Sequence, residues 1–349
     1  MLPPGVAHAL AFAALGPLEH VAAARAVVHG LLAPPDDERI AVQVMGLRFP
    51  SPLGLAAGFD KNARRPRAMA ALGFGHLELG TVTARAQKAN PRPNLFRLPA
   101  DRALVNRLGF PNEGAERVAA RLGRVRGSLK VPVGVSIGKS RAVSAADLKS
   151  VIADYAESLS RVAAVADFVV VNVSSPNTAG LRGLQAREHA LELLATLQRN
   201  APSVRLLVKV APDLGDDELE ELLSVVQETG IAGLVATNTT VAREGLATER
   251  RHLHAVGAGG LSGPPLRARA LQIVERARAR LGRQVVIVGA GGVEGAEHVL
   301  AFMRAGANLV QMYTGLIYEG PGAPARIARD LLRAVERVGA RDLGDLVAG

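Results

Sequence analysis

Short apolar segments alternate with helical patterns from residue 53 onward, and this alternation constrains the fold more than any other feature of the sequence. Strands that are buried on both faces are nearly continuously apolar, whereas an amphipathic helix repeats its apolar positions every three to four residues. The pattern predicts strands at Leu53–Ala57, His76–Gly80, Val133–Ile137, Phe168–Val173, Arg205–Val210, Gly233–Thr237, Val285–Gly289 and Leu309–Met312. It predicts helices between and after them, among others at Ala145–Val165, Ala186–Leu197, Asp216–Glu228, Pro265–Leu281, Gly295–Ala305 and Pro324–Val338. About eight parallel strands close a (β/α)8 TIM barrel, so we expect this α/β fold, with a doubly wound open sheet as the alternative.

Composition narrows the function. The 349 residues fit one barrel as well as two ordinary domains, and no apolar run reaches the length of a membrane-spanning helix. Because the chain has no cysteine, disulfides, thiolate metal sites, iron–sulfur ligation and a cysteine nucleophile are all excluded, and no metal site is expected. The formal net charge of +10 favours an anionic partner: a phosphate-bearing cofactor, a carboxylate substrate or an acidic membrane surface. With only 3% aromatic residues, base stacking on nucleic acid is disfavoured.

Residues 1–40 do not follow the barrel pattern and are predicted to form a helical hairpin. Val6–Leu15 is an apolar helix candidate that Gly16-Pro17 would stop, Leu18–Leu32 is a second one, and Pro34-Pro35 closes the unit. A signal peptide is disfavoured because no basic segment precedes the apolar stretch. Two interpretations remain open: the hairpin packs on the barrel, or it inserts its apolar face into a membrane interface.

Polar side chains collect where the predicted strands end. In a (β/α)8 barrel these ends meet at one rim, and the active site lies there. The residues concerned are Asp60, Lys61 and Asn62 after the first strand, Thr81 and Thr83 after the second, Ser136 and Lys139 at the third, Asn172, Ser174, Ser175 and Asn177 at the fourth, Lys209 in the fifth, Thr237–Thr240 at the sixth, and Tyr313 and Thr314 at the eighth. One such residue is ordinary loop chemistry, but their joint placement predicts a catalytic site.

The last two strands are followed by glycine-containing loops. Gly291-Gly292 and Thr314-Gly315 let backbone N–H groups approach an anion closely, and a following helix N-terminus adds its positive end. Since these loops form the usual phosphate site of the barrel, we expect a phosphate group there.

Several of these segments together resemble one family, from about Pro52 to Pro321. The chain is similar to the dihydroorotate dehydrogenases, and within them to the quinone-dependent class 2. The motifs that carry the resemblance are Ala57–Lys61, Asn106–Phe110, Asn172–Arg182 (NVSSPNTAGLR), Lys209–Asp213, Thr237–Thr240, Gly259–Gly263 and Tyr313–Gly315. The resemblance implies an FMN-binding barrel at 41–349 that oxidises (S)-dihydroorotate to orotate in de novo pyrimidine biosynthesis.

The resemblance also assigns roles. It implies that Ser175 is the base that removes the C5 proton of dihydroorotate, where classes without the hairpin have a cysteine. It implies substrate contacts by Lys61, Asn106, Arg107, Leu108, Gly109, Phe110, Asn172, Asn177, Asn238 and Thr239. It implies an FMN site formed by Ala57, Gly58, Phe59, Asp60, Lys61, Thr81, Ser136, Asn172, Lys209, Thr237, Gly263, Gly292, Tyr313 and Thr314. Lys209 would stabilise the anionic reduced ring.

Two positions depart from the family pattern. Ser136 stands where the family usually has Asn, and Pro111 stands where it usually has Asn after Phe110. At Ser136 a flavin contact is in question, because a hydroxyl reaches less far than the amide of Asn. At Pro111 an amide near the substrate loop is lost, because proline has no side-chain amide.

The resemblance further implies a membrane quinone as electron acceptor, reached along the hairpin, with the enzyme held on an anionic leaflet at the cytoplasmic face as a peripheral protein. No iron–sulfur partner subunit and no nucleic acid are expected. The alternatives are another FMN-barrel enzyme of the dihydropyrimidine or tRNA-dihydrouridine type, which would use a catalytic cysteine that this chain lacks, or a non-catalytic basic barrel that binds RNA or membrane.

Overall fold

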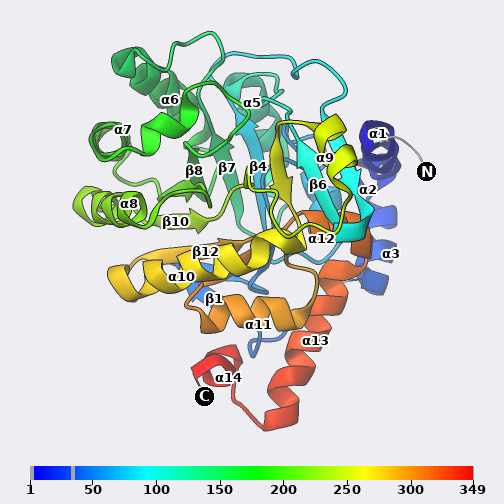
Figure 1. Cartoon of the computed structure of the whole chain (residues 1–349). Coiled ribbons are helices and arrows are strands. Elements are labelled where there is room, and N and C mark those ends of the chain that lie inside the picture. Colours follow the sequence, from blue (N-terminus) through cyan, green and yellow to red (C-terminus); the bar gives the residue numbers. More distant parts are fainter. Residues whose placement is uncertain (1–3, 33–35, 349) are drawn as a thin grey trace.

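A closed parallel barrel forms the centre of the computed structural model, which describes residues 4–32 and 36–348 (Figure 1). Its strands, in chain order, are β3 (Leu53–Leu55), β4 (His76–Val82), β7 (Val133–Ile137), β8 (Phe168–Asn172), β9 (Leu206–Val210), β10 (Gly233–Ala236), β12 (Val286–Ala290) and β13 (Leu309–Met312). Around the barrel they run in the order β10-β12-β13-β3-β4-β7-β8-β9. The (β/α)8 prediction is therefore confirmed, with each predicted strand in place.

Helices cover the outside of the barrel. They are α4 (Pro66–Ala71), α5 (Ala115–Arg126), α6 (Leu148–Val162), α7 (Arg187–Asn200), α8 (Asp216–Thr229), α9 (Arg250–Val256), α10 (Arg267–Leu281), α11 (Ala296–Arg304), α12 (Thr314–Glu319), α13 (Ala323–Val338) and α14 (Leu343–Ala348), with short 3-10 turns η1 (Pro99–Asp101), η2 (Leu181–Gln185) and η3 (Pro264–Leu266). Their apolar faces and the outer faces of the strands make one continuous core. This core fixes the strand ends, and so the rim, in place.

Each end of the barrel carries an additional sheet. The hairpin of β1 (Val42–Val44) and β2 (Leu47–Phe49) closes the N-terminal end, where Phe49 is buried in an apolar cluster with Phe168. The antiparallel sheet β11-β6-β5, made of β5 (Leu95–Leu98), β6 (Ala103–Asn106) and β11 (Gly260–Ser262), belongs to the C-terminal end, because β6 leads into the Asn106 loop of the rim.

Buried in the closed end of the barrel is His76. Its ring meets Phe49 and Phe168 edge-on, with centroids 5.5 and 6.4 Å apart, and neither ring nitrogen has a hydrogen-bond partner among the described residues. Burial lowers the pKa of His76 to about 3. The imidazole is therefore neutral in the folded protein at any pH near neutrality.

This buried imidazole predicts acid sensitivity. Between the unfolded-state pKa of 6.5 and the folded value of about 3, the unfolded chain binds the extra proton, so stability falls as pH falls through this window. From about pH 7.5 to about pH 5 the loss due to His76 should be about 2 kcal/mol. Urea unfolding of the wild type and of His76→Gln at both pH values measures it: the variant should lack this part of the loss. An equal loss in both proteins would contradict the assignment.

Three helices precede the barrel: α1 (Pro4–Ala14), α2 (Gly16–His20) and α3 (Ala22–Leu32). Figure 1 shows them at one side of the barrel, next to β6 and α12. The first helix ends at Ala14, just before Gly16-Pro17 as predicted, and Pro17 then occupies the first turn of α2, where a missing N–H costs nothing. The predicted helix Leu18–Leu32 breaks at Val21, which is extended. Pro34-Pro35 lies outside the described residues.

Side-chain contacts fasten these helices to the barrel. Glu19 is buried and its Oε2 accepts hydrogen bonds from the N–H groups of Arg67 and Ala68 at the start of α4, at 3.0 and 3.2 Å. Burial raises the pKa of Glu19, opposed by these two hydrogen bonds. The guanidinium of Arg65 lies over the Phe12 ring, 5.5 Å from its centroid. Among the described residues no single helix is long and apolar enough to cross a bilayer, although His8–His20 and Ala22–Leu32 pass that test together as a pair bent by 109°.

Candidate active site

A cavity opens at the C-terminal end of the barrel, and every barrel strand except β7 contributes to its wall directly or through the loop that follows it. Most of the residues predicted from the sequence meet in this wall. They are Ala57, Gly58, Lys61, Thr81, Asn106, Leu108, Gly109, Phe110, Asn172, Ser175, Asn177, Lys209, Thr237, Asn238, Thr239, Gly263, Gly292, Tyr313 and Thr314. Residues up to 258 positions apart in the chain thus share one cavity, since Ala56 and Thr314 both line it.

Asparagine amides in the cavity wall form a hydrogen-bonding network of two separate groups. Asn238 Nδ2 donates to Asn172 Oδ1 at 3.2 Å, and Asn172 Nδ2 donates to Thr81 Oγ1 at 3.1 Å. Asn177 Nδ2 donates to Asn106 Oδ1 at 3.1 Å. Because each amide is held by a neighbour, its remaining donors and acceptors have fixed directions, which suits recognition of a planar ring bearing carbonyl and N–H groups.

Ser175 lies in the loop after β8 and is 5% exposed. Its Oγ accepts a hydrogen bond from the backbone N–H of Asn177 at 3.3 Å, which fixes the hydroxyl at the cavity wall and favours negative charge on the oxygen. Thr178 follows closely, and its Oγ1 is buried with no hydrogen-bond partner among the described residues. This hydroxyl remains free to take or pass a proton.

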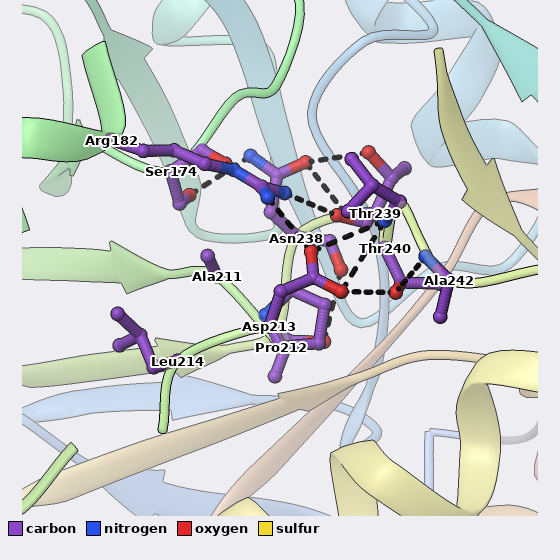
Figure 2. Close-up of polar contacts among 12 residues, drawn as sticks. Ser174, Arg182, Ala211, Pro212, Asp213, Leu214, Asn238, Thr239, Thr240 and Ala242 are labelled. Carbon is purple, nitrogen blue, oxygen red and sulfur yellow. Dashed lines mark hydrogen bonds and ion pairs between the residues drawn. The ribbon is translucent and has the colours of Figure 1, made fainter. Parts of the chain in front are cut away.

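An ion pair outside the cavity ties together the loops that carry these residues (Figure 2). Arg182 Nη1 lies 2.8 Å from Asp213 Oδ2, while its Nε and Nη2 donate to the carbonyl oxygens of Ser174 and Thr239 at 3.0 and 3.1 Å. Asp213 in turn accepts a hydrogen bond from the Thr240 hydroxyl. The loops after β8, β9 and β10 are therefore locked to one another next to Ser175.

Lys61 brings a positive charge to the cavity wall. Its Nζ donates to the carbonyl oxygen of Gly58, and burial lowers its pKa to about 8, with Asp60 opposing the shift. Asp60 itself is buried under the loop, where its carboxylate accepts backbone N–H groups from Arg64 and Arg65 at 2.9 and 2.7 Å. Burial nonetheless raises the pKa of Asp60. Lys61 is thus charged at neutral pH and able to pair with a carboxylate in the cavity.

The two loops predicted to hold phosphate, at Gly291-Gly292 and Thr314-Gly315, lie against each other at the cavity wall, because Gly315 packs on the backbone of Val293. Gly263, assigned to the flavin site by the resemblance, lies beside them. Gly263 and Gly292 have φ of +110° and +66°, which L side chains rarely adopt. A Cβ on Gly292 would come within 2.9 Å of Gly263 O, and one on Gly263 within 2.8 Å of Arg102 O. Both positions therefore pack too closely against neighbouring backbone for a side chain, and this glycine corner suits the close approach of backbone N–H groups to an anion.

Four of the residues that the resemblance assigned to the substrate or the FMN site lie outside the cavity wall. Asp60 acts beneath its loop as described, and Phe59 turns toward a second cavity. Arg107 points away: its Nη1 donates to the carbonyl oxygens of Val256 and Ala258 at 2.6 and 2.7 Å. Ser136 is fully buried and its Oγ hydrogen-bonds Thr81 Oγ1 at 2.9 Å, so the short hydroxyl reaches the cavity only through Thr81.

Two further rim positions from the sequence analysis, Lys139 and Pro111, lie where side-chain hydrogen bonds hold the loops. Lys139 donates to the carbonyl oxygen of Ser140 at 3.1 Å and does not line the cavity. Next to Pro111, the amide of Asn112 fixes the loop, because its Oδ1 accepts from the N–H groups of Thr83 and Gly114 at 3.2 and 2.8 Å. An amide one position further along the chain thus stabilises the loop that Pro111 interrupts.

Sequence reasoning missed part of the wall. The additional lining residues include Ala56, Leu95, Leu104, Ser262, Leu266, Ala290, Val293 and Gln311. Gln311 could have been found, since it is a polar residue within an otherwise apolar strand. Leu95 and Leu104 could not, because they reach the rim through a sheet that pairs distant segments.

A second, largely apolar cavity lies between the N-terminal helices and the barrel. Leu95, Leu104 and Tyr313 line both cavities, so the two adjoin. Burial lowers the pKa of His8 in this wall to about 4, with the charge of Lys61 as a smaller cause. The remaining lining residues are Ala11, Ala14, Leu15, Phe59, Met69, Leu72, Arg97, Leu316, Ile317, Gly320 and Pro321.

The fold and the site together define a cofactor-dependent (β/α)8-barrel enzyme. The features that define it are the closed barrel, the asparagine amides at its rim, the buried lysine and the glycine corner. Comparison with known proteins gives the family. Residues 39–335 match the model of dihydroorotate dehydrogenase, and the chain belongs to this family, whose members are flavin-dependent oxidoreductases.

Relatives agree over nearly the whole chain. The dihydroorotate dehydrogenase (quinone) of Thermobifida fusca is 49% identical over 348 residues, which cover 98% of this chain and 91% of the relative. That of Rhodococcus opacus is 48% identical over 346 residues, covering 99% and 95%. The crystal structure of the Eimeria tenella enzyme in complex with ferulenol superimposes with a TM-score of 0.87 at 34% identity, covering 99% of this chain and 94% of that one.

Proposed function

We propose that this chain works as a quinone-dependent dihydroorotate dehydrogenase with FMN as its flavin. It oxidises dihydroorotate to orotate in pyrimidine biosynthesis and passes the electrons to a quinone. The observation that carries the proposal is the single cavity in which Ser175, the asparagine network and Lys209 meet. Relatives named for this activity over nearly the full length support it.

The cavity fits a flavin mononucleotide. Gly263 and Gly292 lie in the wall next to Thr314, and their backbone packs too closely against its neighbours for a Cβ, which suits backbone contact with a phosphate. Lys209 is 5% exposed at the end of β9 and would hold the ring edge that becomes negative on reduction. Bound there, FMN supplies a hydride acceptor and carries electrons on to the quinone.

The chain's own residues bind the substrate and move its proton. Lys61 would pair with the carboxylate of dihydroorotate, and the amides of Asn172 and Asn238 would hydrogen-bond its ring. Ser175 would take the C5 proton, helped by the Asn177 N–H that favours charge on Oγ. Serine is a weak base, so the proton must move on, and the unpartnered Thr178 hydroxyl is the candidate relay.

For the acceptor we propose the second cavity as the route. Its apolar wall suits a long-chain quinone, and its shared residues Leu95, Leu104 and Tyr313 bring such a molecule beside the flavin site. On this proposal residues 1–40 form the acceptor-access unit and residues 41–349 the catalytic barrel.

The same helices would bind the membrane. Exposed apolar side chains gather on them: Val6, Leu10, Val21, Val27 and Leu31. Inserted into the interface, they would hold the enzyme as a peripheral protein on the cytoplasmic face. The net charge of +10 favours an anionic leaflet, and the aromatic content of only 3% disfavours nucleic acid as a partner.

Two measurements test the function. The purified protein should show the visible absorption bands of a flavin, identified as FMN after release. In steady state, dihydroorotate should be oxidised with a quinone as acceptor and far more slowly with fumarate or NAD⁺. A colourless protein that cannot be reconstituted with FMN would refute the proposal.

The role of Lys61 predicts a pH dependence of orotate binding. Below its pKa of about 8 the ammonium is charged and pairs with the carboxylate, while above it the dissociation constant should rise about tenfold per pH unit. Titration of orotate, followed by the change in flavin absorbance, measures the constant. Lys61→Met should bind weakly with no dependence in this range, and a wild-type profile in that variant would contradict the role.

A further inference from the structure

A fully buried carboxylate, Glu78, lies in the barrel interior behind the cavity wall. It belongs to β4 and is 0% exposed. Its Oε2 accepts a hydrogen bond from Gln311 Nε2 at 2.7 Å. Its Oε1 has no hydrogen-bond partner among the described residues, and Lys209 Nζ lies 3.7 Å from it.

Such a group opposes stability. Burying a carboxylate removes its hydration, which costs free energy. An oxygen without a hydrogen-bond donor does not regain that free energy in the folded protein. Apolar side chains usually fill the interior of this type of barrel. Packing of the barrel interior therefore does not explain why a glutamate stands at position 78. Its two contacts, with Gln311 and Lys209, show which groups it influences.

Both neighbours of Glu78 line the cavity assigned to the flavin. Lys209 and Gln311 are wall residues, from β9 and β13, and Glu78 stands behind the two of them. At this part of the cavity a buried positive charge, that of Lys209, thus lies in the wall and a buried negative charge, that of Glu78, lies next to it. Charges this close act strongly on one another, and on any charge that forms in the cavity, because the surroundings are poorly polarisable.

We propose that Glu78 is a positioning residue that holds the Lys209 ammonium in the cavity wall and offsets its field, so that the flavin is reduced less readily than Lys209 alone would make it. The inference rests on the proposed function, because it needs a flavin in this cavity. A reduced flavin carries negative charge, which Lys209 favours and Glu78 opposes. The pair therefore sets the flavin potential between that of the substrate and that of the acceptor, so that electrons can leave again.

The test is the midpoint potential of the bound flavin, measured by equilibration with a reference dye on purified, flavin-loaded protein. Glu78→Gln keeps the shape of the side chain and removes its charge. It should shift the equilibrium about tenfold toward reduced flavin, which is a rise of about 30 mV for a two-electron couple. Lys209→Met should shift the potential in the opposite direction.

Two further variants separate charge from packing. Glu78→Met is also neutral and should raise the potential as Glu78→Gln does, whereas a purely structural effect would differ between an amide and a thioether. His76→Gln changes a buried polar residue on the same strand, at the closed end of the barrel. It should change the equilibrium between oxidised and reduced flavin by less than about twofold. This control also shows how far a core substitution acts on the flavin without a change of charge.

The outcomes are distinguishable. An unchanged or lowered potential in both neutral Glu78 variants, with flavin bound, overturns the role of Glu78 and leaves the proposed function standing. A wild-type protein that binds no flavin overturns the proposed function itself. Opposite shifts for Glu78→Gln and Lys209→Met, with His76→Gln unchanged, support the inference.

Discussion

Replacing Ser175 with alanine should slow reduction of the bound flavin by dihydroorotate about 10²–10⁴-fold, the usual loss when a positioned general base is removed. The hydroxyl lies in the cavity wall, and the Asn177 N–H that donates to it would lose its acceptor. Stopped-flow mixing of oxidised enzyme with dihydroorotate, followed at the flavin absorption band, measures the step directly. Orotate binding should be nearly unchanged, because Ser175 is assigned to take the C5 proton and not to bind the ring.

The neighbouring serine provides the matched control. Ser174 is also buried, but it does not line the cavity, and its hydroxyl bonds Asn172 Oδ1 and Asn238 Nδ2 at 3.2 and 2.9 Å. Ser174→Ala removes hydrogen bonds from the network without removing a base, so the loss should stay below about tenfold. Flavin reduction at the wild-type rate in Ser175→Ala, or equal losses in the two variants, would exclude Ser175 as the base.

The barrel strands could be predicted because their environment leaves few choices. Val133–Ile137 and Leu309–Met312 have the same bounds in sequence and structure, since both faces of each strand are buried and each apolar run ends at the rim. The site followed from the strands: once parallel strands close a barrel, their ends must meet, and the residues after them meet as well.

Features that depend on distant pairing could not be predicted. The β11-β6-β5 sheet joins segments around residues 97 and 261, and β11 has only three residues, too few for a periodic pattern. The break at Val21 also coincides with a contact between distant segments, because Glu19, two residues earlier, accepts hydrogen bonds from the start of α4. Local sequence contains neither constraint.

Polar residues inside strands carried a signal that strand patterns alone do not use. Glu78 and Gln311 each interrupt an apolar run, and an interior polar residue in a barrel strand needs a partner. The sequence shows that both are out of place in an apolar core. Only the structure shows that they are partners of each other and neighbours of Lys209.

Removing residues 1–36 should abolish reduction of a long-chain quinone and release the protein from membranes, while dihydroorotate still reduces the flavin. The deletion removes His8, Ala11 and Leu15 from the wall of the second cavity and all the exposed apolar side chains of α1–α3. Every predicted substrate and flavin residue lies beyond it, at Ala57 or later. Vesicle sedimentation, quinone turnover and stopped-flow flavin reduction measure the three properties separately.

Point variants test the same idea with the hairpin in place, which matters because the deletion also removes Glu19 from α4 and exposes Phe59 and Met69. Ala11→Phe should narrow the apolar cavity and slow quinone turnover without affecting flavin reduction by dihydroorotate.

Membrane binding needs its own variant and control. Leu10 and Leu31 are 55% and 72% exposed, and Leu10→Glu with Leu31→Glu should weaken binding to anionic vesicles roughly 100-fold, because two apolar anchors become charged. Val338→Glu alters an equally exposed apolar side chain on α13, at 63%, and should leave vesicle binding unchanged.

If the truncated protein reduced long-chain quinone at the full rate, the electrons would have to leave the flavin by the substrate side of the barrel. The apolar cavity would then be packing space between helices and barrel, because a route that can be removed without loss of rate is not the route.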